Sequence, residues 1–158
     1  MSYTKFKKDL EQGKKGERHV ANFLKKQRQA DKVSTAFAGK SHDFVLIYKD
    51  GREEAFETKT DFFAGTKSQN VYLEYQCSEK PSGLTATKSD FWSILIPARQ
   101  IILVFCPKRM WNCLQESKFK KVRGGDRKAT CGFLVPIEDF KKLEFVEVFE
   151  TNTRLTNA

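Results

Sequence analysis

Three charged residues follow one another in a pattern that could bind a metal ion beside a base. Asp43 stands immediately before an apolar run, and Glu57 and Lys59 stand two residues apart after a predicted turn. Side chains two residues apart on a strand project from the same face, about 7 Å apart. Carboxylate oxygens are the ligands that Mg²⁺ prefers. A neighbouring lysine can orient or deprotonate a water, or neutralise charge developing on a phosphate.

These groups are the ones that metal-assisted phosphodiester hydrolysis requires, because a cation polarises the phosphate and lowers the pKa of a bound water. A Glu-x-Lys pattern alone carries little weight in a chain with 29 basic and 20 acidic residues, since a solvated ion pair on an exposed strand has the same pattern. Here the pattern follows a hairpin turn and an acid opens the preceding strand. We therefore favour a functional interpretation.

A predicted hairpin brings the three residues together. Residues 44–48 are apolar throughout, which predicts a strand buried on both faces. The Asp50-Gly51 pair predicts a hairpin turn, and residues 54–60 alternate as a second strand. We expect this hairpin to place Asp43 beside Glu57.

A helix is predicted before the hairpin, from about residue 16 to residue 30, because Val20 and Leu24 recur at helical spacing. Glu17 shares their inward face. A carboxylate in that position is costly unless something pairs with it, and the partner is either a metal ion or a lysine such as Lys59.

The remaining elements predict an α/β fold in one domain, residues 1–158, with a core over about 14–106 and a basic C-terminal extension over about 107–150. The expected order of the core is helix, three strands, helix and strand (αβββαβ), with a central mixed sheet flanked by helices. We expect a third strand at 71–76, a helix that begins at Thr87–Asp90 and includes Phe91 and Trp92, a strand at 101–105, a helix at 107–115, a basic loop at 118–128, a short helix at 136–143 and a strand at 145–149.

Asp43 followed by Glu57-x-Lys59 across a hairpin resembles the signature of the PD-(D/E)XK, or restriction-endonuclease-like, nuclease superfamily. Lys15-Gly16-Glu17 resembles the opening of its Holliday-junction-resolvase branch, and residues 81–92 are similar to small phage-type members. His42 stands where the superfamily usually has a proline. The resemblance covers about residues 14–106.

The resemblance implies a restriction-endonuclease-like fold and an Mg²⁺ cofactor, for which Mn²⁺ would substitute. It implies that Asp43, Glu57, the carbonyl of Thr58 and Glu17 hold the metal, and that Lys59 activates the attacking water. The implied reaction is endonucleolytic cleavage of DNA that leaves 3′-hydroxyl and 5′-phosphate ends. Branched and site-specific double-stranded DNA both remain open as substrates.

Positive charge also points to nucleic acid, because attraction to phosphates supplies most non-specific binding. The net charge is +9, with ten basic against four acidic residues in 1–32 and eight against two in 108–128. Either cluster could instead be a solvated face. The expected substrate contacts are Ser41, His42, Lys88, Lys120, Lys121 and Arg123.

Other classes of protein fit less well. No apolar run approaches the roughly 18 residues that span a bilayer, and residues 1–17 lack the apolar core of a secretory signal. We therefore expect a cytoplasmic protein, with a phage-encoded nuclease among the alternatives, and no membrane partner. A non-catalytic nucleic-acid-binding module, a nuclease acting on RNA and a homodimer also remain open.

Overall fold

The hairpin that carries the three charged residues forms as predicted. The computed structural model describes residues 2–35 and 42–152. Within it, β2 (Phe44–Ile47) and β3 (Glu53–Thr60) pair antiparallel, with Phe44 opposite Phe56. Gly51 takes a φ of +86° in the connecting turn, a conformation that glycine adopts at little cost. Phe56 and Thr58 are buried, whereas Glu57 and Lys59 alternate to the other face, as the sequence pattern predicts.

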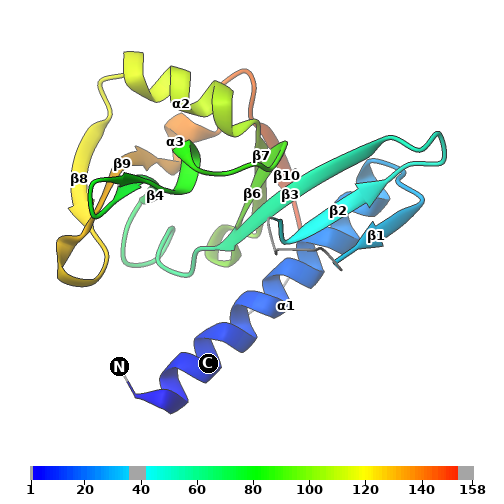
Figure 1. Cartoon of the computed structure of the whole chain (residues 1–158), viewed down its shortest axis with the longest axis horizontal. Helices are drawn as coiled ribbons and strands as arrows, with labels where there is room; N and C mark the ends of the chain where they lie inside the picture. Colours follow the sequence, from blue (N-terminus) through cyan, green and yellow to red (C-terminus); the bar gives the residue numbers. More distant parts are fainter. Residues whose placement is uncertain (1, 36–41, 153–158) are drawn as a thin grey trace.

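This hairpin belongs to a mixed sheet of six strands in the order β1-β2-β3-β6-β7-β10 (Figure 1). β3 and β6 run parallel, and the other neighbours run antiparallel. The other strands of this sheet are β1 (Lys32–Ser34), β6 (Phe91–Ile96), β7 (Ile101–Phe105) and β10 (Glu147–Glu150).

One face of the six-stranded sheet is covered by α1 (Tyr3–Gln27). Val20 and Leu24 of this helix pack on Phe44 and Phe56 in one hydrophobic cluster. Closest to the sheet, Gly16 lies against Thr60: a Cβ added at Gly16 would stand 1.9 Å from the Thr60 hydroxyl oxygen. The glycine therefore sets how near α1 lies to the end of β3.

The opposite face of the six-stranded sheet packs on a second, antiparallel sheet in the order β5-β4-β9-β8, together with two short helices (Figure 1). Trp92, Leu103 and Phe133 are among the buried residues of this larger cluster. The elements on this side are β4 (Asn70–Cys77), β5 (Lys80–Pro81), β8 (Lys120–Gly124), β9 (Thr130–Pro136), α2 (Pro107–Glu116), α3 (Ile137–Phe140) and the 3₁₀ turns Gly83–Thr85, Pro97–Arg99 and Asp126–Lys128.

The structure corrects four expectations. The expected third strand at 71–76 is β4, which joins the second sheet, while β1 supplies the third antiparallel strand beside the hairpin. The helix expected to include Phe91 and Trp92 is instead β6, because both side chains pack between layers of the core and not along one helix face. The first helix begins at Tyr3, not near Gly16, and ends at Gln27. The expected basic loop at 118–128 contains β8.

Other expectations are confirmed. The strand at 101–105 is β7, and the helices expected at 107–115 and 136–143 are α2 and α3. Strands of the C-terminal region join both sheets, since β10 pairs with β7 and β9 pairs with β4. The chain is thus a mixed α/β protein whose two sheets are flanked by helices. No helix in the described part of the chain is long and apolar enough to cross a membrane.

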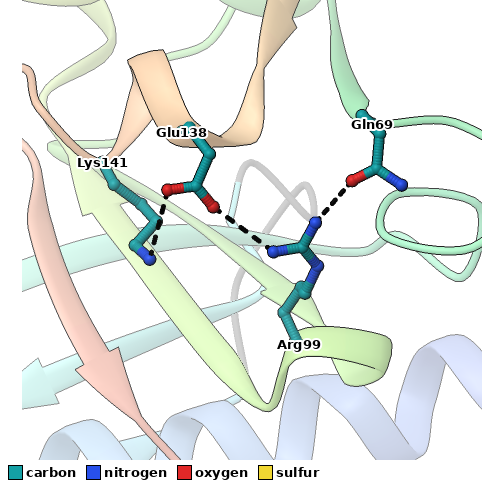
Figure 2. Close-up of polar contacts among 4 residues, drawn as sticks. All are labelled: Gln69, Arg99, Glu138 and Lys141. Carbon is teal, nitrogen blue, oxygen red and sulfur yellow. Dashed lines mark hydrogen bonds and ion pairs between the residues drawn. The ribbon is translucent and has the colours of Figure 1, made fainter.

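A polar network at the turn between β6 and β7 holds the loop that follows β3 (Figure 2). Arg99 donates to Glu138 at 3.3 Å and also to the side chain of Gln69. Lys141 lies 3.8 Å from the same glutamate. Gly65 sits against the Arg99 side chain, where a Cβ would be 3.0 Å from Cγ. The loop from residue 61 to residue 69 is therefore anchored at both its middle and its end.

The contact between Gly16 and Thr60 yields a stability prediction. We expect Gly16→Ala to lower the free energy of unfolding by about 1–3 kcal/mol, because its methyl group would displace a stiff, half-buried threonine. Gly13→Ala is the matched control: nothing lies within 4 Å of its added Cβ, so it should gain about 0.5–1 kcal/mol. Urea denaturation measures both.

A double-mutant cycle with Thr60→Ala isolates the contact. Thr60→Ala should recover part of the loss in the Gly16→Ala background, because it removes the oxygen and the methyl group that collide. Equal losses for Gly16→Ala with and without Thr60→Ala would show that the close approach does not limit stability.

Candidate metal and active site

The site begins where β2 stops and β3 continues. The last paired residues of the hairpin are Phe44 and Phe56, and the Asp43 backbone N–H donates to the Phe56 carbonyl at 2.9 Å just beyond that pair. The Asp43 carboxylate then accepts the Thr58 N–H at 2.7 Å. Since the N–H and C=O of one strand residue point to the same side, the Thr58 carbonyl opens toward Asp43. The Asp43 carboxylate thus replaces the backbone carbonyl that a longer β2 would offer to the Thr58 N–H.

The side chain of Thr58 has a separate role. Its hydroxyl is buried and lies 2.6 Å from the Ser93 hydroxyl on β6, on the face covered by α1. That bond holds β3 against β6 and leaves the Thr58 carbonyl as the group that could bind a cation. This is the atom that the resemblance assigns.

Glu57 and Lys59 project from the face of β3 opposite α1. Thr87 donates to the Glu57 carboxylate at 3.0 Å. Glu57 and Thr87 line a cleft of about 330 Å³ together with Gly83, Ala86 and Lys88. The Lys59 ammonium is 5.3 Å from the centre of the Trp92 ring, and the lysine is exposed. An aromatic face attracts the cation and limits where the ammonium can lie.

Glu17 approaches Asp43 from the α1 side. It lies next to Gly16, so the close contact of that glycine with β3 brings the half-buried Glu17 carboxylate near the end of the sheet. Burial raises the pKa of Glu17, the negative charge of Asp43 raises it further, and Lys14 partly lowers it. None of the ion pairs among the described residues joins Glu17 to Lys59.

The donor set fits Mg²⁺ better than a metal that needs a full protein cage. In residues 2–35 and 42–152, no three acidic, histidine or cysteine side chains form a ready cluster for a metal. What the site offers is the carboxylates of Asp43 and Glu57 and the carbonyl of Thr58. Mg²⁺ is commonly bound through one or two carboxylates and keeps several waters, so these oxygen donors suit it. Glu17 adds negative charge beside Asp43.

The predicted substrate contacts fall into two places. Lys88 is exposed at the cleft beside Glu57, and the His42 ring nitrogen Nδ1 lies 2.8 Å from the Ser89 hydroxyl. Ser41 lies outside the described residues. Lys120, Lys121 and Arg123 are exposed on β8, at the edge of the second sheet, and Lys121 lies over the Phe133 ring.

Sequence reasoning missed the role of Thr87. Thr87 was expected to cap a helix, whereas its hydroxyl binds Glu57. Glu74 accepts the Ser82 hydroxyl at 2.8 Å and so holds the turn before the cleft. A register shift between Glu74 and Gln76 interrupts the pairing of β4 with β9. The polar run around Thr87 was the signal, but it is typical of caps and loops alike.

Comparison with known proteins adds no assignment, because no family model, curated protein or solved structure matches this chain. The chemistry of the site therefore rests on its own geometry.

The proximity of Glu17 to Asp43 predicts how the stability of the protein depends on pH when no cation is bound. A raised pKa in the folded state means that stability is greatest below the ordinary carboxyl pKa and falls as pH rises through the folded-state value. Without metal at neutral pH, Glu17→Gln should therefore raise the melting temperature. The gain should vanish near pH 4. Glu11→Gln, at an exposed acid of the same helix, is the matched control and should change little.

Added Mg²⁺ should reverse the ranking of wild type and Glu17→Gln. A cation bound only by the folded state raises stability by mass action, and wild type should gain more because it keeps the charge that attracts the ion. Thermal melts in chelator and in Mg²⁺ measure both effects. A Glu17→Gln protein that melts below wild type in chelator, or gains as much from Mg²⁺, would return this residue to a purely structural role.

Proposed function

We propose that this protein is an Mg²⁺-dependent endonuclease that hydrolyses phosphodiester bonds in DNA. The observation that carries the proposal is the hydrogen bond from the Thr58 N–H to the Asp43 carboxylate, which fixes that carboxylate at the part of β3 that bears Glu57 and Lys59. Two carboxylates and a carbonyl could hold the cation, and an exposed lysine follows them on the same strand. These are the groups that metal-assisted hydrolysis needs at one position.

The proposed roles follow from where each group lies. Asp43, Glu57 and the Thr58 carbonyl would hold the metal, which supplies Lewis acidity and a water of lowered pKa when bound. Thr87 fixes the rotamer of Glu57 through its hydrogen bond. Lys59 would orient the attacking water or neutralise charge on the phosphate, and its position over Trp92 limits its freedom. Glu17 would act on the Asp43 side of the metal.

The order of elements supports the finer fold proposal, a restriction-endonuclease-like core. A helix precedes three antiparallel strands, β1-β2-β3, and β6 then lies parallel to β3. The crossover from β3 to β6 contains β4 and β5 in place of the expected helix. The resemblance therefore rests on α1, the hairpin and the parallel strand beside it.

Lys59→Ala tests the chemical step. We expect cleavage of plasmid DNA in Mg²⁺ to fall at least about 100-fold while DNA affinity changes less than twofold, because the lysine acts on the water or on developing charge. Lys142→Ala, at an exposed lysine that follows α3, is the control and should cleave normally. Undiminished cleavage by Lys59→Ala would contradict the assigned role.

Asp43→Asn and Glu57→Gln test the metal site. Each should raise the Mg²⁺ concentration for half-maximal cleavage by at least about tenfold, because a neutral amide oxygen is a poorer ligand for a hard cation. Glu53→Gln makes the same change at an exposed position of β3 and should have no effect. Full cleavage in excess EDTA would exclude the metal mechanism, whereas DNA binding without cleavage by wild type would favour the non-catalytic alternative.

The basic strand β8 tests where duplex DNA binds. Reversing the charges of Lys120, Lys121 and Arg123 should weaken binding similarly for all duplex sequences. The slope of log affinity against log salt should flatten by about 0.9 for each phosphate contact removed. Fluorescence anisotropy over a range of salt measures the slope. An unchanged slope would place the duplex away from β8.

A further inference from the structure

One face of α1 runs without interruption from the protein core to solvent. Tyr3, Phe6, Leu10, Gly13, Glu17, Val20 and Leu24 follow one another at alternating spacings of three and four residues. That spacing keeps all seven on a single helix face. Val20 and Leu24 are buried on the six-stranded sheet, and Glu17 is at the candidate site. The N-terminal part of α1 extends beyond the sheet (Figure 1).

The α1 arm, defined as residues 3–15, carries large apolar side chains into water. Tyr3 is 80% exposed, Phe6 56% and Leu10 50%. A helical segment of about three turns has little stability of its own. Large apolar side chains exposed along such a segment, at the spacing of residues that face a core, indicate that it binds a partner. Phe63, on the loop that follows β3, is another large apolar side chain, and it is 59% exposed. Among the described residues, Val148 is the one other large hydrophobic side chain that is exposed.

Phe63 is held rigidly near the site. Its loop leaves the end of β3, three residues beyond the Thr60 that packs on Gly16. The Asp61 carboxylate accepts the N–H groups of Phe63 and Ala64 at 3.0 and 2.9 Å, and Ala64 is fully buried. The Lys67 ammonium lies 5.1 Å from the centre of the Phe63 ring. The Phe63 ring, with the Lys67 ammonium beside it, is thus exposed on a loop that hydrogen bonds hold in place.

The net charge of the α1 arm favours a nucleic acid over a second copy of the chain as its partner. The α1 arm has five lysines against one aspartate and one glutamate, a net charge of +3. A second copy of the arm would bring +3 against +3, whereas a nucleic acid strand supplies the opposite charge. Exposed aromatics combined with lysines are the features that bind unpaired nucleotides, because every base has a face that stacks on an aromatic ring.

We propose that the α1 arm and the Phe63 loop bind an unpaired DNA strand that extends from the cleaved position, with Tyr3, Phe6 and Phe63 stacking on bases. This inference rests on the proposed nuclease function for its biological meaning, and it deepens that function by naming DNA with unpaired nucleotides as the substrate class. The arm is long enough for the task. From Glu17 to Tyr3 the helix rises about 21 Å, the length of roughly six stacked nucleotides.

Binding without catalysis tests the proposal separately from the nuclease function. Fluorescence anisotropy in EDTA would compare a 30-base-pair duplex with the same duplex carrying a 12-nucleotide single-stranded tail. Wild type should bind the tailed DNA at least about tenfold more tightly, since one stacked base contributes roughly 5- to 150-fold. Tyr3→Ala/Phe6→Ala and Phe63→Ala should each remove most of that preference and leave duplex affinity within twofold.

Two further variants distinguish stacking on the rings from general apolar contact. Tyr3→Leu/Phe6→Leu keeps the apolar surface and removes the rings, so it should lose the preference as the alanine pair does. Val148→Ala, a truncation on β10, should keep it. All substituted side chains are exposed, and circular dichroism checks that each variant is folded.

The possible results lead to different conclusions. Equal affinity of wild type for both DNAs, or an unchanged preference in the alanine variants, would overturn the proposal. Sedimentation that shows a wild-type dimer converted to monomer by Tyr3→Ala/Phe6→Ala, with the preference unchanged, would assign the arm to a second copy. A tail preference that depends on the aromatics in a protein without Mg²⁺-dependent cleavage would uphold this proposal and refute the nuclease function.

Discussion

The hydrogen bond from the Thr58 N–H to the Asp43 carboxylate, 2.7 Å long, determines the rest of the candidate site. It forms because β3 continues beyond the end of β2 and would otherwise leave a backbone donor without a ladder partner. The bond fixes the Asp43 carboxylate and uses one of its lone pairs, and the Thr58 carbonyl points to the same side of β3. Glu57 precedes Thr58 on the same strand. The Asp43 carboxylate is therefore positioned by the backbone of β3.

The same arrangement creates an electrostatic cost that a cation would relieve. The raised pKa of Glu17 records its burial and its proximity to Asp43. Gly16 enforces that proximity, since any larger residue would push α1 away from Thr60. Acids with perturbed pKa values are common at sites that bind a charged ligand, although ion-pair networks in the fold also perturb them. Helix packing and site chemistry are thus linked through one glycine.

Local sequence signals predicted the hairpin because its turn, its apolar run and its alternation agree with one another. They predicted the side on which Glu57 and Lys59 lie for the same reason. They failed where partners distant in sequence decide the structure. Phe91 and Trp92 follow residues typical of a helix cap, yet pairing with β3 and β7 makes them a strand. Likewise, the alternation at residues 71–76 predicts a strand but not its sheet, and the bond from Thr87 to Glu57 joins residues 30 apart.

The end of the β2–β3 hairpin is the proposed site of a divalent cation. A crystal of the wild-type protein soaked in Mn²⁺ tests this proposal, because the anomalous scattering of manganese locates the ion without reference to activity. We expect an anomalous peak between the carboxylates of Asp43 and Glu57, at bonding distance from the Thr58 carbonyl, and its loss in Asp43→Asn. A Mn²⁺-saturated crystal with no peak at this position would contradict the account, whatever other sites the ion occupied.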